Sequence, residues 1–269
     1  MTQPLTQPWT IGDLYEPYVG RWSRLVARAF LAWFDAAPSL DWLDVGCGTG
    51  ALTEAIAMTC APRRLAGIDP SVGFLEFAQR RLGDGAEFQP AHAGDLPFGE
   101  AEFDHVVSGL VLNFVPDPAR AVEEMVRVSR PGGEVAVYVW DYAGKMELMR
   151  NFWDAAAALD PQARELDEGK RFPICSPHSL QQLFMAGGLV GVESRPIDIP
   201  TIFRDFDDYW TPFLGGQGPA PAYCMSLTED ARAILRERLR DTLPGRPDGS
   251  IHLLARAWAV RGRKRRLPD

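Results

Sequence analysis

The segment LDVGCGTGAL, residues 43–52, constrains the fold of this chain more than any other stretch. A short apolar run containing an acidic residue leads into three glycines at alternate positions, and a helix-forming segment follows. Glycines without a Cβ let a turn approach a ligand closely, and the helix after the turn directs its N-terminus toward the same place. The pattern predicts a strand, a ligand-binding turn and a helix in direct succession.

The same alternation of strand and helix continues to residue 140. Apolar runs predict five strands, at residues 41–46, 63–71, 86–95, from 103 onward and at 134–142. Amphipathic or apolar segments predict helices at residues 18–36, 51–59, 73–82 and 118–130, and Pro-Gly-Gly at 131–133 is expected to form a turn. This order predicts an α/β fold with a doubly wound, Rossmann-like parallel sheet.

The pattern changes after Trp140. Two irregular, aromatic-rich segments interrupt the second half, the first directly after strand five and the second between a sixth strand at 189–199 and a strand-like segment at 250–262. Between the first insert and the sixth strand, residues 176–188 predict a helix with a serine cap. Ligands bind at the carboxyl edge of such a sheet, so both inserts are expected to form a helical lid. The predicted organisation is an N-terminal cover helix (1–36), a cofactor-binding core (37–140), a lid insert (141–174), the core continued (175–200), a second lid insert (201–249) and the last core strand with a basic tail (250–269).

Composition narrows the classes of partner. The net charge of −8 argues against a nucleic-acid or anionic-membrane partner, and the basic run at 261–266 is expected to be a solvated tail. Four scattered cysteines suggest no zinc site, so no metal is expected, and they fit reduced thiols in a cytoplasmic protein. We see neither a signal peptide nor the roughly 18 apolar residues that a membrane span needs.

The glycine turn alone does not identify the ligand. Gly46, Gly48 and Ala51 also satisfy the dinucleotide fingerprint, which leaves an NAD-linked dehydrogenase as an alternative. A P-loop is excluded because no Gly-Lys-Ser/Thr follows.

Three carboxylates favour a different ligand. Asp44, Asp69 and Asp95 follow or end the first three predicted strands. Such carboxylates oppose a pyrophosphate but suit a ligand that has an ammonium group, ribose hydroxyls and an exocyclic adenine amine. S-adenosylmethionine has these groups, carries no phosphate and adds a positive sulfonium.

The motifs LDVGCGTG, GIDPS, GDLPF, FDHVVSGLVLNFVPDP and RVSRPGGEVAVYVWD, in this order, resemble the class I S-adenosylmethionine-dependent methyltransferases. The similarity is to the small-molecule branch (type 11) that includes the ubiquinone/menaquinone-biosynthesis type, and it covers residues 18–140. It implies a seven-stranded sheet whose last strand is antiparallel. The resemblance also implies these cofactor-binding residues: Arg21, Asp44, Gly46, Cys47, Gly48, Asp69, Pro70, Gly94, Asp95, Leu96, Leu110 and Asn113.

Within that implied set, Asp44 and the first two glycines surround the methionine moiety, Asp69 holds the ribose, and Asp95 with Leu96 meets the adenine. Arg21 is a candidate for the cofactor carboxylate, by a charge-assisted contact.

The resemblance implies in-line transfer of a methyl group to a small-molecule acceptor. Much of the rate enhancement then comes from holding the acceptor atom in line with the methyl group. A general base is needed only if the acceptor keeps its proton. Candidates for a residue touching the acceptor are Tyr15, Tyr18, Asp141 and Tyr142, whereas His92 and His105 are expected to be structural. A non-catalytic S-adenosylmethionine-binding protein remains an alternative, and the acceptor and oligomeric state are not predicted.

Overall fold

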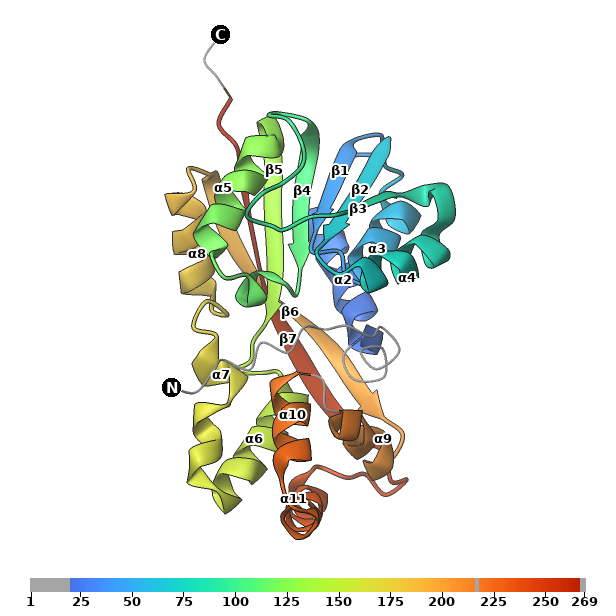
Figure 1. Cartoon of the computed structure of the whole chain (residues 1–269), viewed down its shortest axis with the longest axis vertical. Helices are drawn as coiled ribbons and strands as arrows, with labels where there is room; N and C mark the ends of the chain where they lie inside the picture. Colours follow the sequence, from blue (N-terminus) through green and yellow to red (C-terminus); the bar gives the residue numbers. More distant parts are fainter. Residues whose placement is uncertain (1–19, 216–217, 267–269) are drawn as a thin grey trace. The chain divides into compact units, whose positions relative to one another are not determined.

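A computed structural model describes residues 20–215 and 218–266 (Figure 1). Its single described sheet has the strand order β3-β2-β1-β4-β5-β7-β6. The strands are β1 (Asp41–Val45), β2 (Arg64–Asp69), β3 (Glu87–Pro90), β4 (Phe103–Gly109), β5 (Ser129–Trp140), β6 (Val190–Phe203) and β7 (Ile251–Arg263). The pairs among β1 to β5 are parallel and β7 is antiparallel to β5, which confirms the predicted Rossmann-like sheet.

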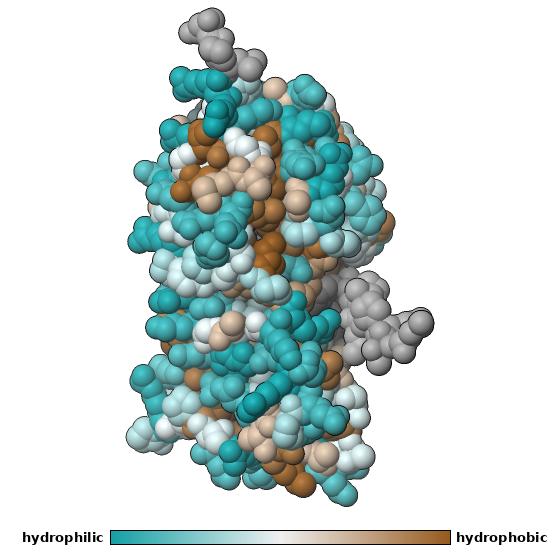
Figure 2. Space-filling view, turned by 90° about the vertical axis from the view of Figure 1, so that its left-hand side faces the viewer, coloured by the Kyte–Doolittle hydropathy of each residue, from teal (hydrophilic) through white to brown (hydrophobic). Residues whose placement is uncertain are grey.

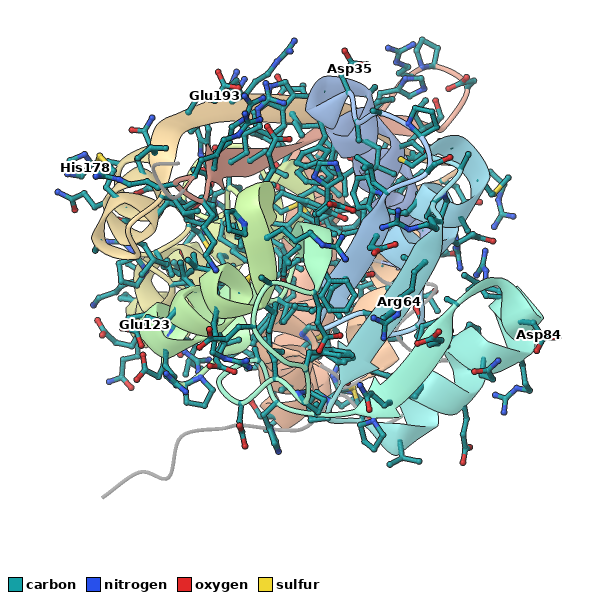
Figure 3. The ribbon with its side chains drawn as sticks, turned by 90° about the horizontal axis from the view of Figure 1, so that it is seen from above. Asp35, Arg64, Asp84, Glu123, His178 and Glu193 are labelled. Atoms are coloured by element: carbon teal, nitrogen blue, oxygen red, sulfur yellow. The ribbon has the colours of Figure 1, made fainter. Side chains whose placement is uncertain are left out.

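Helices flank the sheet where the sequence predicts them. They are α2 (Arg21–Phe34), α3 (Ala51–Thr59), α4 (Val72–Leu82), α5 (Pro118–Val128) and α8 (Pro177–Ala186). Ser71, Asp117 and Ser176 cap α4, α5 and α8 by accepting backbone N–H groups, as expected for these residue types. Figure 3 shows α2, which ends beside Asp35, and α5, which carries Glu123, on opposite sides of the sheet. Hydrophilic side chains predominate on the face in Figure 2, between smaller hydrophobic patches. The apolar residues Val26, Phe30 and Phe34 of α2 are buried.

The described residues divide into two compact units. The sheet unit comprises residues 23–140, 174–197 and 257–266, and the second unit comprises residues 20–22, 141–173 and 198–256. The helices of the second unit are α6 (Glu147–Leu159), α7 (Glu168–Arg171), α9 (Phe206–Trp210), α10 (Pro219–Ser226) and α11 (Glu229–Thr242). Its own core is aromatic: Phe152 stacks on Phe213 at 4.4 Å, and Trp153 lies 5.5 Å from Tyr223 between ring centroids. That this unit acts as a lid stays a prediction.

Several predicted boundaries were wrong, some because of the local backbone and some because of pairing with distant strands. The strand β5 begins at Ser129 instead of after a Pro-Gly-Gly turn, because Gly132 (φ +83°) and a register shift against β4 accommodate the irregular start. The strand β3 ends at Pro90, which has no N–H to donate, whereas β6 continues to Phe203. The helix α2 ends at Phe34, where Asp35 adopts a left-handed conformation.

The basic run at the end of the chain is not a solvated tail over residues 261–264. Arg261 pairs with Glu193 at 2.6 Å and Arg263 with Glu134 at 2.7 Å. The Lys264 ammonium donates to the backbone carbonyl oxygens of Arg127, in the last turn of α5, and of Ser129, the first residue of β5. These cations extend and secure the antiparallel strand β7, which the charge pattern alone could not indicate.

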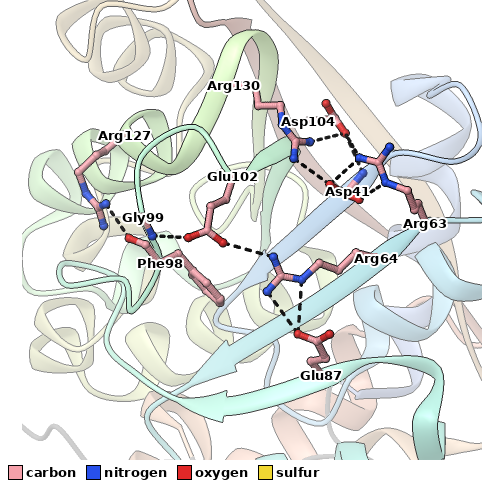
Figure 4. A network of polar contacts seen from close by, with 10 residues as sticks. All are labelled: Asp41, Arg63, Arg64, Glu87, Phe98, Gly99, Glu102, Asp104, Arg127 and Arg130. Atoms are coloured by element: carbon pink, nitrogen blue, oxygen red, sulfur yellow. Dashed lines mark hydrogen bonds and ion pairs between the residues drawn. The ribbon is translucent and has the colours of Figure 1, made fainter.

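An ion-pair network joins the amino ends of the strands (Figure 4). Asp41 accepts from Arg63 at 2.8 and 2.6 Å and from Arg130 at 2.9 Å, while Arg130 also lies 2.8 Å from Asp104. The hydrogen bond from Arg63 is the main reason that the pKa of Asp41 is lowered. The amino edge is thus held by its own charges, and the carboxyl edge, where the glycine turn lies, carries the candidate site.

His105 is a structural histidine, as expected. It is 7% exposed, and its ring lies 4.6 Å from Trp42 and 4.9 Å from Phe34 between centroids. Within the described part of the chain neither ring nitrogen has a hydrogen-bond partner, and burial lowers the pKa of His105.

We therefore expect the contribution of His105 to stability to fall with acidification below about pH 6.5, the ordinary pKa of histidine. The unfolded chain then takes up a proton that the folded protein resists, so folding becomes less favourable as pH decreases. His105→Phe should flatten the dependence of the unfolding free energy on pH between about 7 and 5, measured by denaturant titration. His178→Phe, at an exposed histidine, is the control substitution. Equal slopes for His105→Phe and the parent protein would contradict this role.

Candidate active site

The glycine turn is packed on one side and open on the other. The N–H groups of Gly46 and Cys47 donate to the carbonyl oxygen of Ile68 at 2.7 and 2.9 Å, which ties the turn to the end of β2. Gly46 (φ +73°) lies so close to Val111 that an added Cβ would stand 2.5 Å from its Cγ1. At Gly48 (φ +53°), by contrast, no described atom lies within 4 Å of an added Cβ. A ligand can therefore approach the backbone at Gly48.

Asp44 lies in β1, one residue before its end, and is fully buried. The hydroxyl of Thr53 donates to its Oδ2 at 2.7 Å, and its Oδ1 has no partner among the described residues. Burial, with a smaller contribution from the nearby Asp69 carboxylate, raises the pKa of Asp44 to about 7. A buried acid with one unpaired oxygen is stabilised in its charged form by a cationic ligand group.

Asp69 ends β2 and is 8% exposed. Its Oδ2 accepts the N–H of Gly48 at 3.0 Å, and its Oδ1 accepts the N–H of Ser71 at 2.8 Å. Pro70, the residue between Asp69 and Ser71, is exposed. Burial raises the pKa of Asp69 despite these two backbone hydrogen bonds. Each carboxylate oxygen has a further lone pair, so Asp69 can shape the glycine turn and still accept from a ligand hydroxyl.

The sequence predicts that Asp95 lies at the end of the third strand. In the structure it lies outside that strand. It follows β3 by five residues and is exposed, in a loop whose next residue, Leu96, is 4% exposed. The carbonyl oxygen of Gly94 accepts from Arg120 at 3.2 Å. The loop conformation therefore depends on contacts with α5 instead of on the sheet.

The segment after β4 lies against the glycine turn through Val111. Leu110 adopts a left-handed conformation (φ 64°) that turns the chain, and the short helix η3 (Leu112–Phe114) follows. Asn113 is 8% exposed, and over the described residues neither its Oδ1 nor its Nδ2 finds a hydrogen-bond partner. Buried amides are rarely left unpaired in a native protein, so Asn113 is a candidate ligand contact.

Cys47 and Arg21, both in the implied cofactor-binding set, have surroundings that indicate what each side chain does. Cys47 is buried and burial raises the pKa of its thiol well above the ordinary value, so the side chain is a packed, protonated thiol and only its backbone serves the turn. Arg21 belongs to the second unit, where it donates to Asp208 at 2.9 Å. Its guanidinium lies 4.4 and 4.8 Å from the centroids of the Trp22 and Phe203 rings. In the described structure its Nε and Nη2 atoms are buried without an acceptor.

The structure does not single out a general base. The carboxylate of Asp141 accepts the N–H groups of Gly144 at 3.1 Å and Lys145 at 3.0 Å, so it caps the turn after β5. Tyr142 is 6% exposed and its ring lies 5.7 Å from that of Phe172. Tyr15 and Tyr18 lie outside the described residues. All four remain candidates.

The sequence analysis did not predict two residues that hydrogen-bond to candidate site residues. Thr53, on α3, is the partner of Asp44. Glu124, on α5, is 2% exposed and accepts the N–H of Leu96 at 2.9 Å. A usable signal for Glu124 was its place among the apolar residues of an amphipathic helix, where an unpaired acid would be costly.

The described residues contain no group of three or more His, Cys, Asp or Glu side chains placed to hold a metal ion. No helix among them is long and apolar enough to cross a membrane.

A family model and curated relatives that match this chain are methyltransferases. A methyltransferase-domain family model matches residues 43–137. A demethylmenaquinone methyltransferase of Desulfitobacterium hafniense is 35% identical over 188 residues, which cover 60% of this chain and 74% of that protein. The chain spans about half the length of the first curated relatives that it matches.

Solved structures share the fold. The YcgJ protein from Bacillus subtilis matches with a TM-score of 0.59 and 19% identity, over 90% of this chain and 99% of that one. Phosphoethanolamine N-methyltransferase 2 from Haemonchus contortus, solved in complex with S-adenosyl-L-methionine, matches with a TM-score of 0.59 and 14% identity, over 97% of this chain and 59% of that one.

Proposed function

Because the chain belongs to the class I S-adenosylmethionine-dependent methyltransferases, we propose that it transfers a methyl group from S-adenosylmethionine to a small-molecule acceptor. The observation that carries the proposal is the buried carboxyl of Asp44, whose Oδ1 has no partner in the described structure. Such a group beside an open glycine turn suits a phosphate-free, cationic nucleoside. The printed names of relatives, demethylmenaquinone methyltransferases, support a small-molecule acceptor.

Different residues of the sheet unit bind different parts of the cofactor. Asp44 takes the ammonium group, Gly48 allows close approach of the backbone, and Asp69 accepts from the ribose hydroxyls. Asp95 and Leu96 meet the adenine from the loop after β3.

When bound, S-adenosylmethionine supplies a methyl group activated by its sulfonium. The acceptor atom would take up this methyl group in place of the carbon–sulfur bond, whose electron pair would remain with sulfur. The protein contributes chiefly by orienting the acceptor on the axis of that bond. If the acceptor keeps a proton, that proton leaves to solvent or to one of the four candidate side chains.

Titration calorimetry with S-adenosylmethionine, S-adenosylhomocysteine and NAD tests the cofactor. Binding of the first two but not of NAD supports the proposal, and binding of NAD alone overturns it in favour of a dehydrogenase. Release of S-adenosylhomocysteine in the presence of a panel of phenols, quinols and amines tests transfer. Cofactor binding without turnover on any acceptor would instead favour a non-catalytic binding protein.

Asp69→Ala is expected to weaken S-adenosylhomocysteine binding by about 1–3 kcal/mol, because ligand hydroxyls and the Gly48 N–H both lose their acceptor. The dissociation constant from calorimetry measures the effect. Asp84→Ala is the matched control, since Asp84 lies in the short helix η2 (Gly83–Gly85) at the periphery (Figure 3). Unchanged affinity in Asp69→Ala would contradict the assigned ribose contact.

A further inference from the structure

The loop between β3 and β4 lacks support from the sheet. The strand β3 ends at Pro90 and β4 begins at Phe103, so no ladder of backbone hydrogen bonds holds the residues on which adenine recognition depends. Asp95 is exposed, and its own backbone N–H bonds only locally, to the carbonyl oxygen of His92 at 3.0 Å. Some other element must fix where the Asp95 carboxylate stands.

A charged group on α5 provides that support. Glu124 is 2% exposed, and its Oε2 accepts the N–H of Leu96 at 2.9 Å. Arg127 donates to both oxygens of Glu124, at 2.8 and 2.7 Å, and Arg120 lies 3.1 Å from its Oε1. The hydrogen bond from Arg127 is the largest cause of the lowered pKa of Glu124, so the carboxylate is charged.

The same arginines hold the carbonyl oxygens of the loop. Arg127 donates to Leu96 at 3.0 Å and to Phe98 at 2.7 Å, and Arg120 donates to Gly94 at 3.2 Å. Both backbone polar groups of Leu96 are thereby bound by one ion pair. Charge-assisted hydrogen bonds of this kind are stronger and more directional than neutral ones.

We propose that Glu124 and Arg127 are positioning residues for cofactor recognition, which clamp the backbone of Leu96 so that the adjacent Asp95 carboxylate faces the exocyclic amine of the adenine. The inference rests on the proposed function. Neither side chain contacts the ligand; both act through the loop. They determine selectivity for the adenine base while leaving the acceptor and the transfer step to other residues.

The test compares Glu124→Gln with Glu123→Gln. Glutamine keeps the shape at position 124 but removes the charge that binds Arg127 and places an amide where both carboxylate oxygens accept. Glu123 is the neighbouring acid on the exposed face, where it lies 3.5 Å from Arg120. Arg127→Lys, which retains the charge but not the fork of donors, serves as a second variant if Glu124→Gln does not fold.

The readout is calorimetric affinity for S-adenosylhomocysteine and for S-inosylhomocysteine, in which an oxygen replaces the exocyclic amine. We expect Glu124→Gln to bind S-adenosylhomocysteine about tenfold more weakly and to lose most of the discrimination between the two compounds. Glu123→Gln should match the parent in every measurement.

Unchanged discrimination in a folded Glu124→Gln or Arg127→Lys variant would overturn the inference, as would an equal loss of affinity for both compounds. Failure of the parent protein to bind S-adenosylhomocysteine would refute the proposed function itself, and the two failures are thus distinguishable.

Discussion

Asp44→Asn is expected to weaken S-adenosylmethionine binding by at least about 2 kcal/mol, roughly thirtyfold, while making the ligand-free protein more stable at pH 8. The loss of affinity follows because asparagine cannot supply the negative charge that the ligand ammonium needs. The gain in stability follows because the folded protein otherwise holds a fully buried carboxylate, whose Oδ1 is unpaired within the described structure. Opposite effects on binding and stability distinguish a ligand-binding acid from a structural one.

The sign of the pH dependence follows from the raised pKa of Asp44, about 7 in the folded protein against an ordinary value of 3.8. The folded state holds this proton more tightly than the unfolded chain does. The stability that results is complete below about pH 3.8 and is lost as the pH rises through about 7. Asparagine does not titrate, so the advantage of the variant should grow from pH 5 to pH 8 and reach about 2–4 kcal/mol.

Chemical denaturation at pH 5 and pH 8, with calorimetry at both, measures these effects. The parent protein should bind S-adenosylmethionine more tightly as the pH rises through about 7, because the bound cation requires the ionised carboxyl. If Asp44 contacts the ammonium, S-adenosylmethionine and S-adenosylhomocysteine lose equal affinity in the variant. A variant that binds both as the parent does would remove Asp44 from the site.

Gly46→Ala and Gly48→Ala should separate the packed side of the turn from its open side. Gly46→Ala is expected to lower the unfolding free energy by about 3 kcal/mol or more, since it combines left-handed strain with a methyl group 2.5 Å from Val111. Gly48→Ala should cost only about 1 kcal/mol, the strain alone, because no described atom lies within 4 Å of the new methyl group. Its main effect should be on ligand affinity, because that methyl group occupies the space open to the cofactor.

Thermal or denaturant unfolding and calorimetry on the two variants check this contrast. Gly85→Ala is a suitable control, since Gly85 is free of close contacts and is not among the glycines with positive φ. A Gly48→Ala variant with full affinity for S-adenosylhomocysteine would show that the ligand does not approach the turn at that position.

The sequence alone was sufficient for the order of strands and helices in the sheet unit, the serine cap of α8 and the glycine turn. These features depend on near neighbours: a period of two or 3.6 residues, a Ser before a helix, and glycines at positions where φ is positive. The carboxyl ends of β1 and β2 could therefore be predicted to carry Asp44 and Asp69.

Only the tertiary structure decided what depends on residues far apart in the chain. The support of Leu96 by Glu124, the pairing of Arg261 with Glu193 and the continuation of β6 to Phe203 all require partners brought together by folding. The raised pKa of Asp44 likewise depends on burial by the assembled sheet, not on its neighbours in sequence. Desolvation and long-range pairing are properties of the packed chain, and a local pattern of residues does not encode them.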